Sequence, residues 1–137
     1  MGKLHICTLT PDQDILEGIH QYLMDKTWKG ALIVGAVGSI YDVTVGNPGT
    51  LSQDRNQPPQ IIATTVNRPC EIISLTGEIN RLEDISMGLP DHLKSTPSGY
   101  LVHIHLSCSH DEGVVLGGGI HKAKVLRAAN IYMMELE

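Results

Sequence analysis

The chain has 137 residues, of which 15 are acidic and 10 are basic, so its formal net charge is −5. This length predicts a single domain over residues 1–137. A negative surface is a poor match for the phosphate backbone of nucleic acids, and a chain with no Phe, one Trp and four Tyr has few rings for stacking bases. The composition therefore disfavours nucleic-acid binding. With 42% hydrophobic and 18% charged residues, it also excludes a disordered chain.

No stretch of the sequence reaches the roughly 20 apolar residues of a membrane span. The start of the chain lacks the apolar core of a signal peptide, so a cytoplasmic protein without membrane contact is expected. The cysteines Cys7, Cys70 and Cys108 are odd in number and widely spaced, which argues against a disulfide framework. They are expected to be buried free thiols.

The first elements follow a strand-then-helix pattern. Residues 3–9 predict a strand, and Thr10 with Gln13 predicts a reciprocal cap at a helix start, with Pro11 in the first helical position. Apolar residues then recur at helical spacing: Ile15, Leu16, Ile19, Tyr22 and Leu23. The pattern predicts an amphipathic helix that ends near Gly30 and lies on a sheet.

The middle of the chain is typical of strands separated by long loops. Residues 31–45 are apolar and β-branched with internal glycines, which predicts one strand, or two short ones with a bend. Residues 46–59 predict an exposed loop, and residues 60–66 and 71–79 predict two further strands. A polar excursion over residues 81–99 is expected to be a flap or an interface segment.

The last third of the chain predicts a hairpin. Alternation over residues 100–107 places apolar side chains on one face, with His103 and His105 on the other. A turn leads into a partner strand over residues 114–120, and a last strand over residues 124–136 closes the sheet. One main helix among many strands, without βα alternation, predicts an α+β fold with a mostly antiparallel sheet.

The two histidines of the hairpin suggest a metal site. His103 and His105 leave the same face of a strand with Cα atoms about 6.5–7 Å apart, which suits two imidazoles converging on one metal. With the expected turn, His105 would lie opposite Gly117 and His103 opposite Gly119, and His121 would be a diagonal neighbour of His103. His103, His105 and His121 are therefore predicted ligands of zinc or another divalent metal, with water in the open position.

The triple glycine Gly117, Gly118 and Gly119 is expected to leave open space beside the histidines for a ligand pocket. Two histidines at this spacing also suit a hydrogen-bonded, metal-free sheet face or subunit interface, so both interpretations stay open. The glycines match no phosphate-binding loop, and no catalytic motif occurs, so enzymatic activity is undecided.

Three segments resemble the plants-and-prokaryotes-conserved (PPC) domain in the right order along nearly the whole chain. RPCEIISLTG at residues 68–77 is similar to the family's GRFEILSLSG, and GAVGSI at residues 35–40 is similar to its sgiGavs strand. HIHLS at residues 103–107, followed by VLGG at residues 115–118, resembles HLHISL…VVGGHL. The resemblance implies an α+β homotrimer of a family usually described as candidate DNA-binding proteins.

The resemblance also implies functional residues. Stand-alone prokaryotic members of the family bind a metal through the histidines of HxH and GGH, which His103 and His105 match in part. Gly119 stands where the third histidine is expected, and His121 follows two residues later. The AT-hooks of plant members, with their Arg-Gly-Arg-Pro core, are absent from this sequence.

The segment that contains Arg68 and Glu71 serves partner contact in plant members, which makes these two residues candidates for the same role. Glu71 is alternatively expected to pair with Arg68 or Arg81 within the chain. Three functions follow as hypotheses: a homotrimeric metal- or small-ligand-binding module with a histidine-lined pocket, a DNA-binding regulatory protein, or a protein-interaction scaffold.

Overall fold

The computed structural model describes residues 2–51, 53–85 and 88–137. Within this part, one α-helix and six strands follow each other along the chain: β1 (Leu4–Leu9), α1 (Ile15–Leu23), β2 (Gly30–Pro48), β3 (Ile61–Val66), β4 (Cys70–Arg81), β5 (Tyr100–Ser109) and β6 (Val115–Glu135). Two short 3₁₀ turns, Leu82–Asp84 and Asp91–Leu93, lie between β4 and β5. No helix in the described residues is long and apolar enough to span a membrane.

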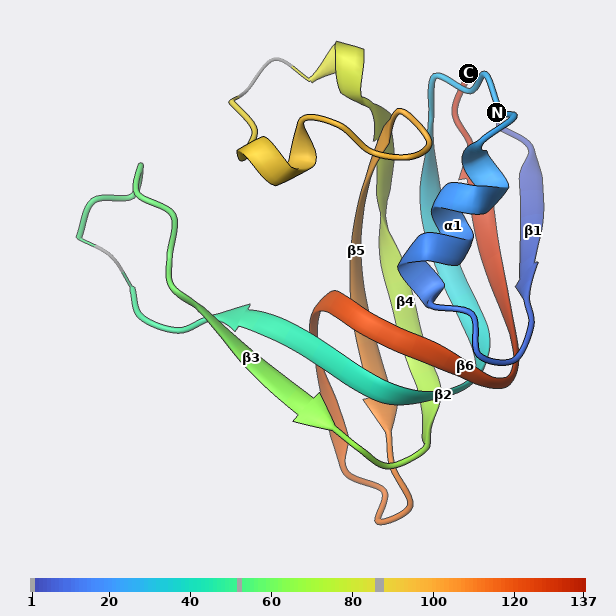
Figure 1. The fold of residues 1–137 in the computed structure, drawn as a ribbon, viewed down its shortest axis with the longest axis vertical. Coiled ribbons are helices and arrows are strands. Elements are labelled where there is room, and N and C mark those ends of the chain that lie inside the picture. Colours follow the sequence, from blue (N-terminus) through green and yellow to red (C-terminus); the bar gives the residue numbers. More distant parts are fainter. Residues whose placement is uncertain (1, 52, 86–87) are drawn as a thin grey trace.

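The strands form one antiparallel sheet in the order β1-β6-β5-β4-β2-β3, and β6 also pairs with β2. The circuit β2–β4–β5–β6 is therefore closed by hydrogen bonds, because β2 and β6 pair from Ala31 opposite Glu135 to Gly46 opposite Gly119. Helix α1 covers one face of this sheet (Figure 1). The predicted combination of a mostly antiparallel sheet with one packing helix is confirmed.

Helix α1 is shorter than the sequence pattern predicts. The contact between the Thr10 backbone N–H and Gln13 Oε1 forms, at 2.8 Å, but it closes a turn ahead of the helix. Asp12 has a φ of 71°, a left-handed conformation that stops a helix from running on from Pro11. The N-cap is Asp14, whose carboxylate accepts from the Glu17 N–H at 3.1 Å. The helix ends at Leu23, where the apolar stripe ends, and not near Gly30.

Strand β6 is one continuous element where the sequence suggests two. Residues 121–123 interrupt the alternation of apolar residues, but the chain stays paired with β2 through irregularities in the register, with Lys122 opposite Thr44. A β-bulge adds one residue to a strand, which shifts the alternation of inward and outward side chains, and the strand still stays in the sheet. For residues 31–45 the sequence left open one strand or two short ones, and the structure has one element, β2, which runs on to Pro48.

The core lies between α1 and the sheet face that it covers. Inward-facing strand residues meet the buried face of α1, and these side chains are almost entirely aliphatic; the largest fully buried ones include Ile15, Ile19, Leu23, Ile40, Leu75, Ile79, Leu106, Ile131 and Met133. Cys7, Cys70 and Cys108 are buried free thiols, as expected. Burial of this aliphatic surface supplies the main driving force for the fold.

The opposite face of the sheet is uncovered, and one row of side chains crosses it. Leu4, Met134, Leu32, Glu78 and His103 are successive register partners on β1, β6, β2, β4 and β5. On β1 and β2, Leu4, Ile6, Leu32 and Val34 expose 52%, 54%, 43% and 53% of their surface. This uncovered face, which we call the outer face, is apolar on the β1 and β2 side and polar where it reaches β5.

The end of β2 and the whole of β3 project from the body as an arm (Figure 1). In the arm, residues 43–48 of β2 pair with β3, and the described part of residues 49–60 connects the two strands. The excursion over residues 82–99 connects the end of β4 to the start of β5, and it is closed by the Leu82 N–H, which donates to the Gly99 carbonyl at 3.0 Å. The excursion lies outside the sheet circuit, whereas the arm begins within it, because residues 44–46 of β2 pair with β6 as well as with β3.

Candidate functional site

His103 and His105 lie side by side on the outer face of β5. Their ring centroids are 5.1 Å apart and the rings are nearly perpendicular, at 88°. Both side chains are exposed, whereas Ile104 between them is buried, as the alternation in the sequence predicts. The two rings border a cavity of about 250 Å³, which Thr76, Gly77 and Glu78 of β4 also line. The prediction that His103 and His105 lie on the same face of the strand is confirmed.

Strand β4 forms the other wall of this cavity. Thr76 lies opposite His105, and Glu78 lies opposite His103. Between them, a Cβ atom on Gly77 would stand 2.1 Å from the His103 carbonyl oxygen, so only glycine fits this position. We call Thr76, Glu78, His103 and His105 the β4–β5 cluster. The sequence analysis did not identify Glu78. Glu78 precedes His103 by 25 residues, and no local pattern indicates that the two lie opposite each other.

The polar side chains of the β4–β5 cluster make no hydrogen bond or ion pair with any other residue that the structure describes. Other histidines have polar partners in the chain: His5 with Glu135 at 2.9 Å, His20 with Ser98 at 2.7 Å and His110 with Arg68 at 3.3 Å. His103 and His105 are therefore not explained as hydrogen-bonded structural histidines within this chain. They are available to an external ligand.

The hairpin register differs from the expected one by two residues. His105 lies opposite Gly119, and Ser107 lies opposite Gly117. The turn is one residue further along the chain than expected: the Gly113 N–H donates to the His110 carbonyl at 2.8 Å, and Gly113 has a φ of 75°. A turn displaced by one residue changes each pairing by two, which is the observed difference.

His121 does not line the cavity that His103 and His105 border. Strand β6 pairs with β5 only as far as Gly119, where it begins to pair with Gly46 of β2. The His121 ring lies beside Gly46, since a Cβ atom on Gly46 would stand 2.6 Å from His121 Nε2. In residues 2–51, 53–85 and 88–137, no three His, Cys, Asp or Glu side chains stand ready to hold a metal ion together.

The three glycines have different surroundings. A Cβ atom on Gly117 would stand 2.6 Å from the Leu106 carbonyl oxygen, and one on Gly118 would stand 2.6 Å from Asn47 Nδ2. At these two positions glycine lets neighbouring segments approach closely. A Cβ atom on Gly119 would meet only ordinary contacts, at 3.5 Å or more. The cavity beside the histidines is lined by β4 and not by these glycines.

The second predicted region, around Arg68 and Glu71, forms an ion-pair cluster with the hairpin turn. Arg68 Nη1 lies 3.1 Å from Asp111 Oδ1 and 2.9 Å from Glu112 Oε1. Arg81 pairs with Asp84, at 2.8 Å, so neither arginine takes Glu71 as its partner. The expected pairing of Glu71 is wrong, because the turn brings two carboxylates to Arg68. Glu71 itself is exposed on β4.

Cys7 and Cys108 are poor nucleophiles in this fold. Burial raises the pKa of the Cys7 thiol to about 11. Burial, together with the neighbouring Cys70 thiol, raises the pKa of Cys108 to about 12. Both thiols therefore stay protonated near neutral pH and lack the thiolate that reacts or binds metal.

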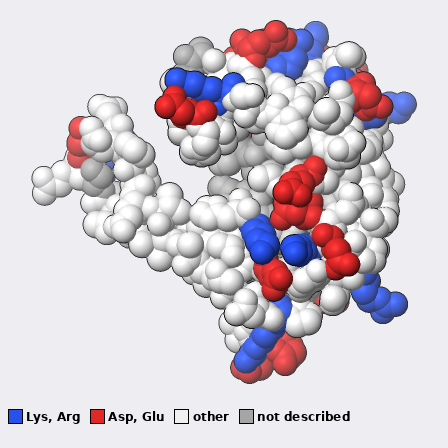
Figure 2. All heavy atoms as spheres, viewed as in Figure 1, with Lys and Arg blue, Asp and Glu red and all other residues white. Residues whose placement is uncertain are grey.

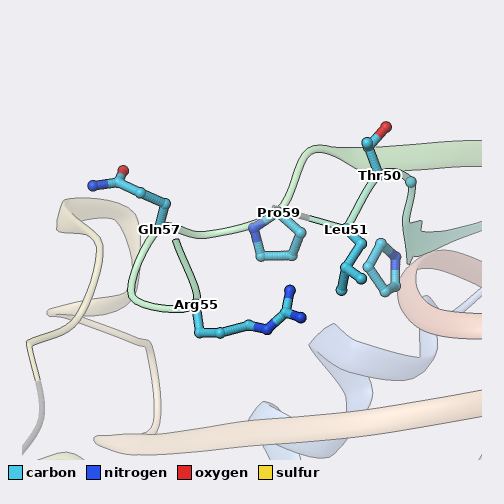
Figure 3. Close-up of a pocket in the computed structure, with 7 residues that line it drawn as sticks. Thr50, Leu51, Arg55, Gln57 and Pro59 are labelled. Atoms are coloured by element: carbon cyan, nitrogen blue, oxygen red, sulfur yellow. The ribbon is translucent and has the colours of Figure 1, made fainter. Parts of the chain in front are cut away.

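In the part of the chain that the structure describes, three larger cavities lie outside the β4–β5 cluster. One, of about 510 Å³, lies between residues 26–27, the end of β4 and residues 98–100. A second, of about 390 Å³, is in the arm, where the Arg55 side chain extends beneath Leu51 and Pro59 (Figure 3). These two cavities contain neither a histidine nor a residue that the sequence singles out as a site. The third, of about 270 Å³, is lined by His110 and by Glu71, one of the two candidate partner-contact residues.

Comparison with known proteins identifies the fold. The family model of the Plants and Prokaryotes Conserved (PCC) domain matches residues 1–137. The structure of a plant- and prokaryote-conserved protein from Pyrococcus horikoshii superposes with a TM-score of 0.72 at 20% identity and covers 99% of this chain and 80% of that chain. No curated protein matches the sequence.

Two further structures share the fold. A metal-containing protein from Archaeoglobus fulgidus has a TM-score of 0.71 at 24% identity, with 99% of this chain and 81% of that chain covered. A candidate DNA-binding protein from Bacteroides thetaiotaomicron has a TM-score of 0.69 at 18% identity, with 98% and 79% covered. At these identities the likeness establishes the architecture alone.

Proposed function

Because the chain belongs to the Plants and Prokaryotes Conserved domain family, we propose that it is a metal- or small-ligand-binding module whose ligand is held by His103 and His105. The observation that carries the proposal is the β4–β5 cluster. It joins two neighbouring imidazoles, without polar partners among the described residues, to a cavity of about 250 Å³.

The spacing of the two rings suits a divalent metal. Two imidazoles that share a tetrahedral zinc ion, through Zn–N bonds of about 2.0–2.1 Å, hold their ring centroids about 5 Å apart. The centroids of His103 and His105 are 5.1 Å apart, which matches this separation. Imidazole is a common ligand of zinc and of other divalent transition metals. The structural neighbour from Archaeoglobus fulgidus, a metal-containing protein, supports the same class of ligand.

The proposal includes self-association as a homotrimer, which the family resemblance implies. The outer face supports association, because exposed Leu4, Ile6, Leu32 and Val34 together form an uncovered apolar area. The same row of register partners leads from Leu32 through Glu78 to His103, so the metal site would lie at the margin of the associating face. The cytoplasmic location expected from the sequence stays a prediction.

Metal analysis tests the proposal directly. Protein expressed without a histidine tag and purified without added metal is measured by mass spectrometry of its metals, beside His103→Ala, His105→Ala and His121→Ala. We expect metal in the wild type and its loss in the first two variants. The role of His121 as third ligand stays a prediction, which the last variant checks. Wild-type protein that carries no metal and takes up no added Zn²⁺ would refute the proposal.

DNA binding is the second candidate function, favoured by the name of the neighbour from Bacteroides thetaiotaomicron. Acidic and basic side chains are intermingled on the face shown in Figure 2, without a basic stripe, and the net charge is −5. A gel-shift series that starts at about 50 mM salt, where phosphate contacts are strongest, decides the matter. Absence of a shift even there removes the hypothesis for this chain.

The interaction-scaffold hypothesis rests on Arg68 and Glu71. Arg68 is held by Asp111 and Glu112, whereas the Glu71 side chain is exposed on the neighbouring strand. A partner that takes Arg68 has to compete with two carboxylates. Partner contact at this position therefore ranks below the metal site.

A further inference from the structure

We propose that Glu78 is the third donor of the metal site, so that this chain binds its metal through two imidazoles and one carboxylate. The inference rests on the proposed function of His103 and His105 and identifies the residue that completes their site. In place of three histidines, this donor set has two histidines of β5 and one glutamate of β4, and these two strands are adjacent.

Position is the first argument. Glu78 of β4 and His103 of β5 are direct register partners, and both side chains leave the outer face. Directly opposed residues of an antiparallel pair have Cβ atoms about 4.5–5.5 Å apart. A glutamate carboxylate reaches past its Cβ by two bonds, so a rotation of the exposed side chain brings it to a metal held by the rings. Gly77 strengthens this proximity because it lets the backbones of β4 and β5 approach.

Availability is the second argument. The Glu78 carboxylate makes no hydrogen bond or ion pair with the described residues. Its register partner on the other side is Leu32 of β2, which offers it no polar group. By contrast, Arg68 and Arg81 hold the carboxylates of Asp111, Glu112 and Asp84. Glu78 is therefore an unneutralised carboxylate beside two unpaired imidazoles, an arrangement that a divalent cation stabilises.

Elimination is the third argument. Across β5 from His105, on the β6 side, stands Gly119, which has no donor atom in a side chain. The His121 ring lies beside Gly46, the β2 partner of Gly119, and it does not line the cavity. Of the residues that line the cavity, Thr76 and Glu78 are the remaining ones with side-chain oxygen atoms. A carboxylate is the stronger ligand of the two for zinc, at about 2.0–2.2 Å.

Chemistry fits this donor set. Two histidines and one carboxylate hold zinc with an open position, and the same set holds Fe²⁺. No such group of three is preassembled in the described residues, so Glu78 has to turn toward the metal when the metal binds. Because Glu78 is exposed, this rotation displaces only water.

The test is a titration of metal-free protein with Zn²⁺ alone, in competition with a coloured chelator. The variants are Glu78→Gln and, as a matched control, Glu71→Gln, which removes the same charge from an exposed position of the same strand. We expect Glu78→Gln to weaken zinc binding by about tenfold or more, because loss of even an outer partner of a metal ligand has effects of this size. Glu71→Gln and His121→Ala should bind as the wild type does.

A second readout uses Co²⁺, whose visible spectrum reports its ligands. The spectrum of the Co²⁺ form should change in Glu78→Gln and stay the same in Glu71→Gln, while the thermal unfolding midpoint of both metal-free variants stays close to that of the wild type.

Each alternative outcome is distinguishable. If His103→Ala abolishes zinc binding but Glu78→Gln binds as tightly as the wild type, the inference about Glu78 is wrong and the proposed function stands. If His121→Ala, and not Glu78→Gln, loses the metal, the third ligand is the one expected from the sequence. If the wild type itself binds no zinc, both the proposed function and this inference are wrong.

Discussion

His105 lies directly opposite Gly119 across the β5–β6 hairpin. The family resemblance places the third metal-binding histidine at this same position, so the register explains how an HxH strand and a GGH strand can share one metal. In this chain the β5 half of that arrangement is present and the side chain on β6 is missing. The cavity beside His103 and His105 is bordered by β4 instead.

Replacing Gly119 by His should restore a three-imidazole set. A Cβ atom at Gly119 has its nearest contacts at 3.5 Å, to the Gly46 carbonyl oxygen, and at 3.8 Å, to His105 Cδ2, so a side chain is accepted there. We expect Gly119→His to bind Zn²⁺ about tenfold more tightly than the wild type, measured by chelator competition. Gly119→Ala, the control, should leave the affinity unchanged. A folded Gly119→His protein with wild-type affinity would show that the position does not face the metal.

Gly77→Ala should destabilise the protein. Its new Cβ atom would stand 2.1 Å from the His103 carbonyl oxygen and 2.8 Å from Ile104 Cα, so β4 and β5 would have to separate. We expect a loss of about 2 kcal/mol or more in the free energy of unfolding, measured by urea denaturation. Gly35→Ala is the matched control, because a Cβ atom there meets nothing within 4 Å. Equal effects of the two substitutions would contradict the close approach.

Stability should fall in weak acid because of His20. Burial lowers the pKa of His20 from its usual 6.5, and its Nδ1 lies 2.7 Å from Ser98 Oγ of the excursion. The unfolded chain then takes up a proton at a higher pH than the folded chain, so the stabilisation present above pH 6.5 is lost as the pH falls through the lowered pKa.

Thermal unfolding of the wild type and His20→Gln between about pH 7.5 and about pH 5 measures this effect. The variant should lose less stability over this range than the wild type does. Parallel curves for the two proteins would assign the acid sensitivity to other groups.

The outer face should mediate self-association. Leu32 exposes 43% of its surface at the centre of the row from Leu4 to His103. We expect light scattering to give a trimer for the wild type at micromolar concentration and a smaller species for Leu32→Glu, because a charge is costly in a buried interface. Met24→Glu changes an apolar residue at the end of α1 that is more exposed, at 54%, and this variant should remain trimeric. A monomeric wild type would refute the predicted assembly.

Local patterns in the sequence predicted many of the elements. The period of two over residues 100–107 placed His103 and His105 on one face, and the apolar stripe from Ile15 to Leu23 gave the helix its buried side. The start of α1 was predicted less well, because Asp12 adopts a left-handed conformation that the cap-like pattern before it does not reveal. Propensity and periodicity describe a few neighbouring residues at a time, so boundaries set by single backbone angles escape them.

By itself, the sequence determined the class of fold, the family and the pair of histidines, since all three depend on order and spacing along the chain. Only the tertiary structure decided what stands opposite that pair. The hairpin register depends on the position of one turn, and it placed Gly119 across from His105. The pairing of β4 with β5 joins residues 25 positions apart, and it placed Glu78 beside His103. Contacts of this kind follow from how strands associate, and no local period in the sequence encodes them.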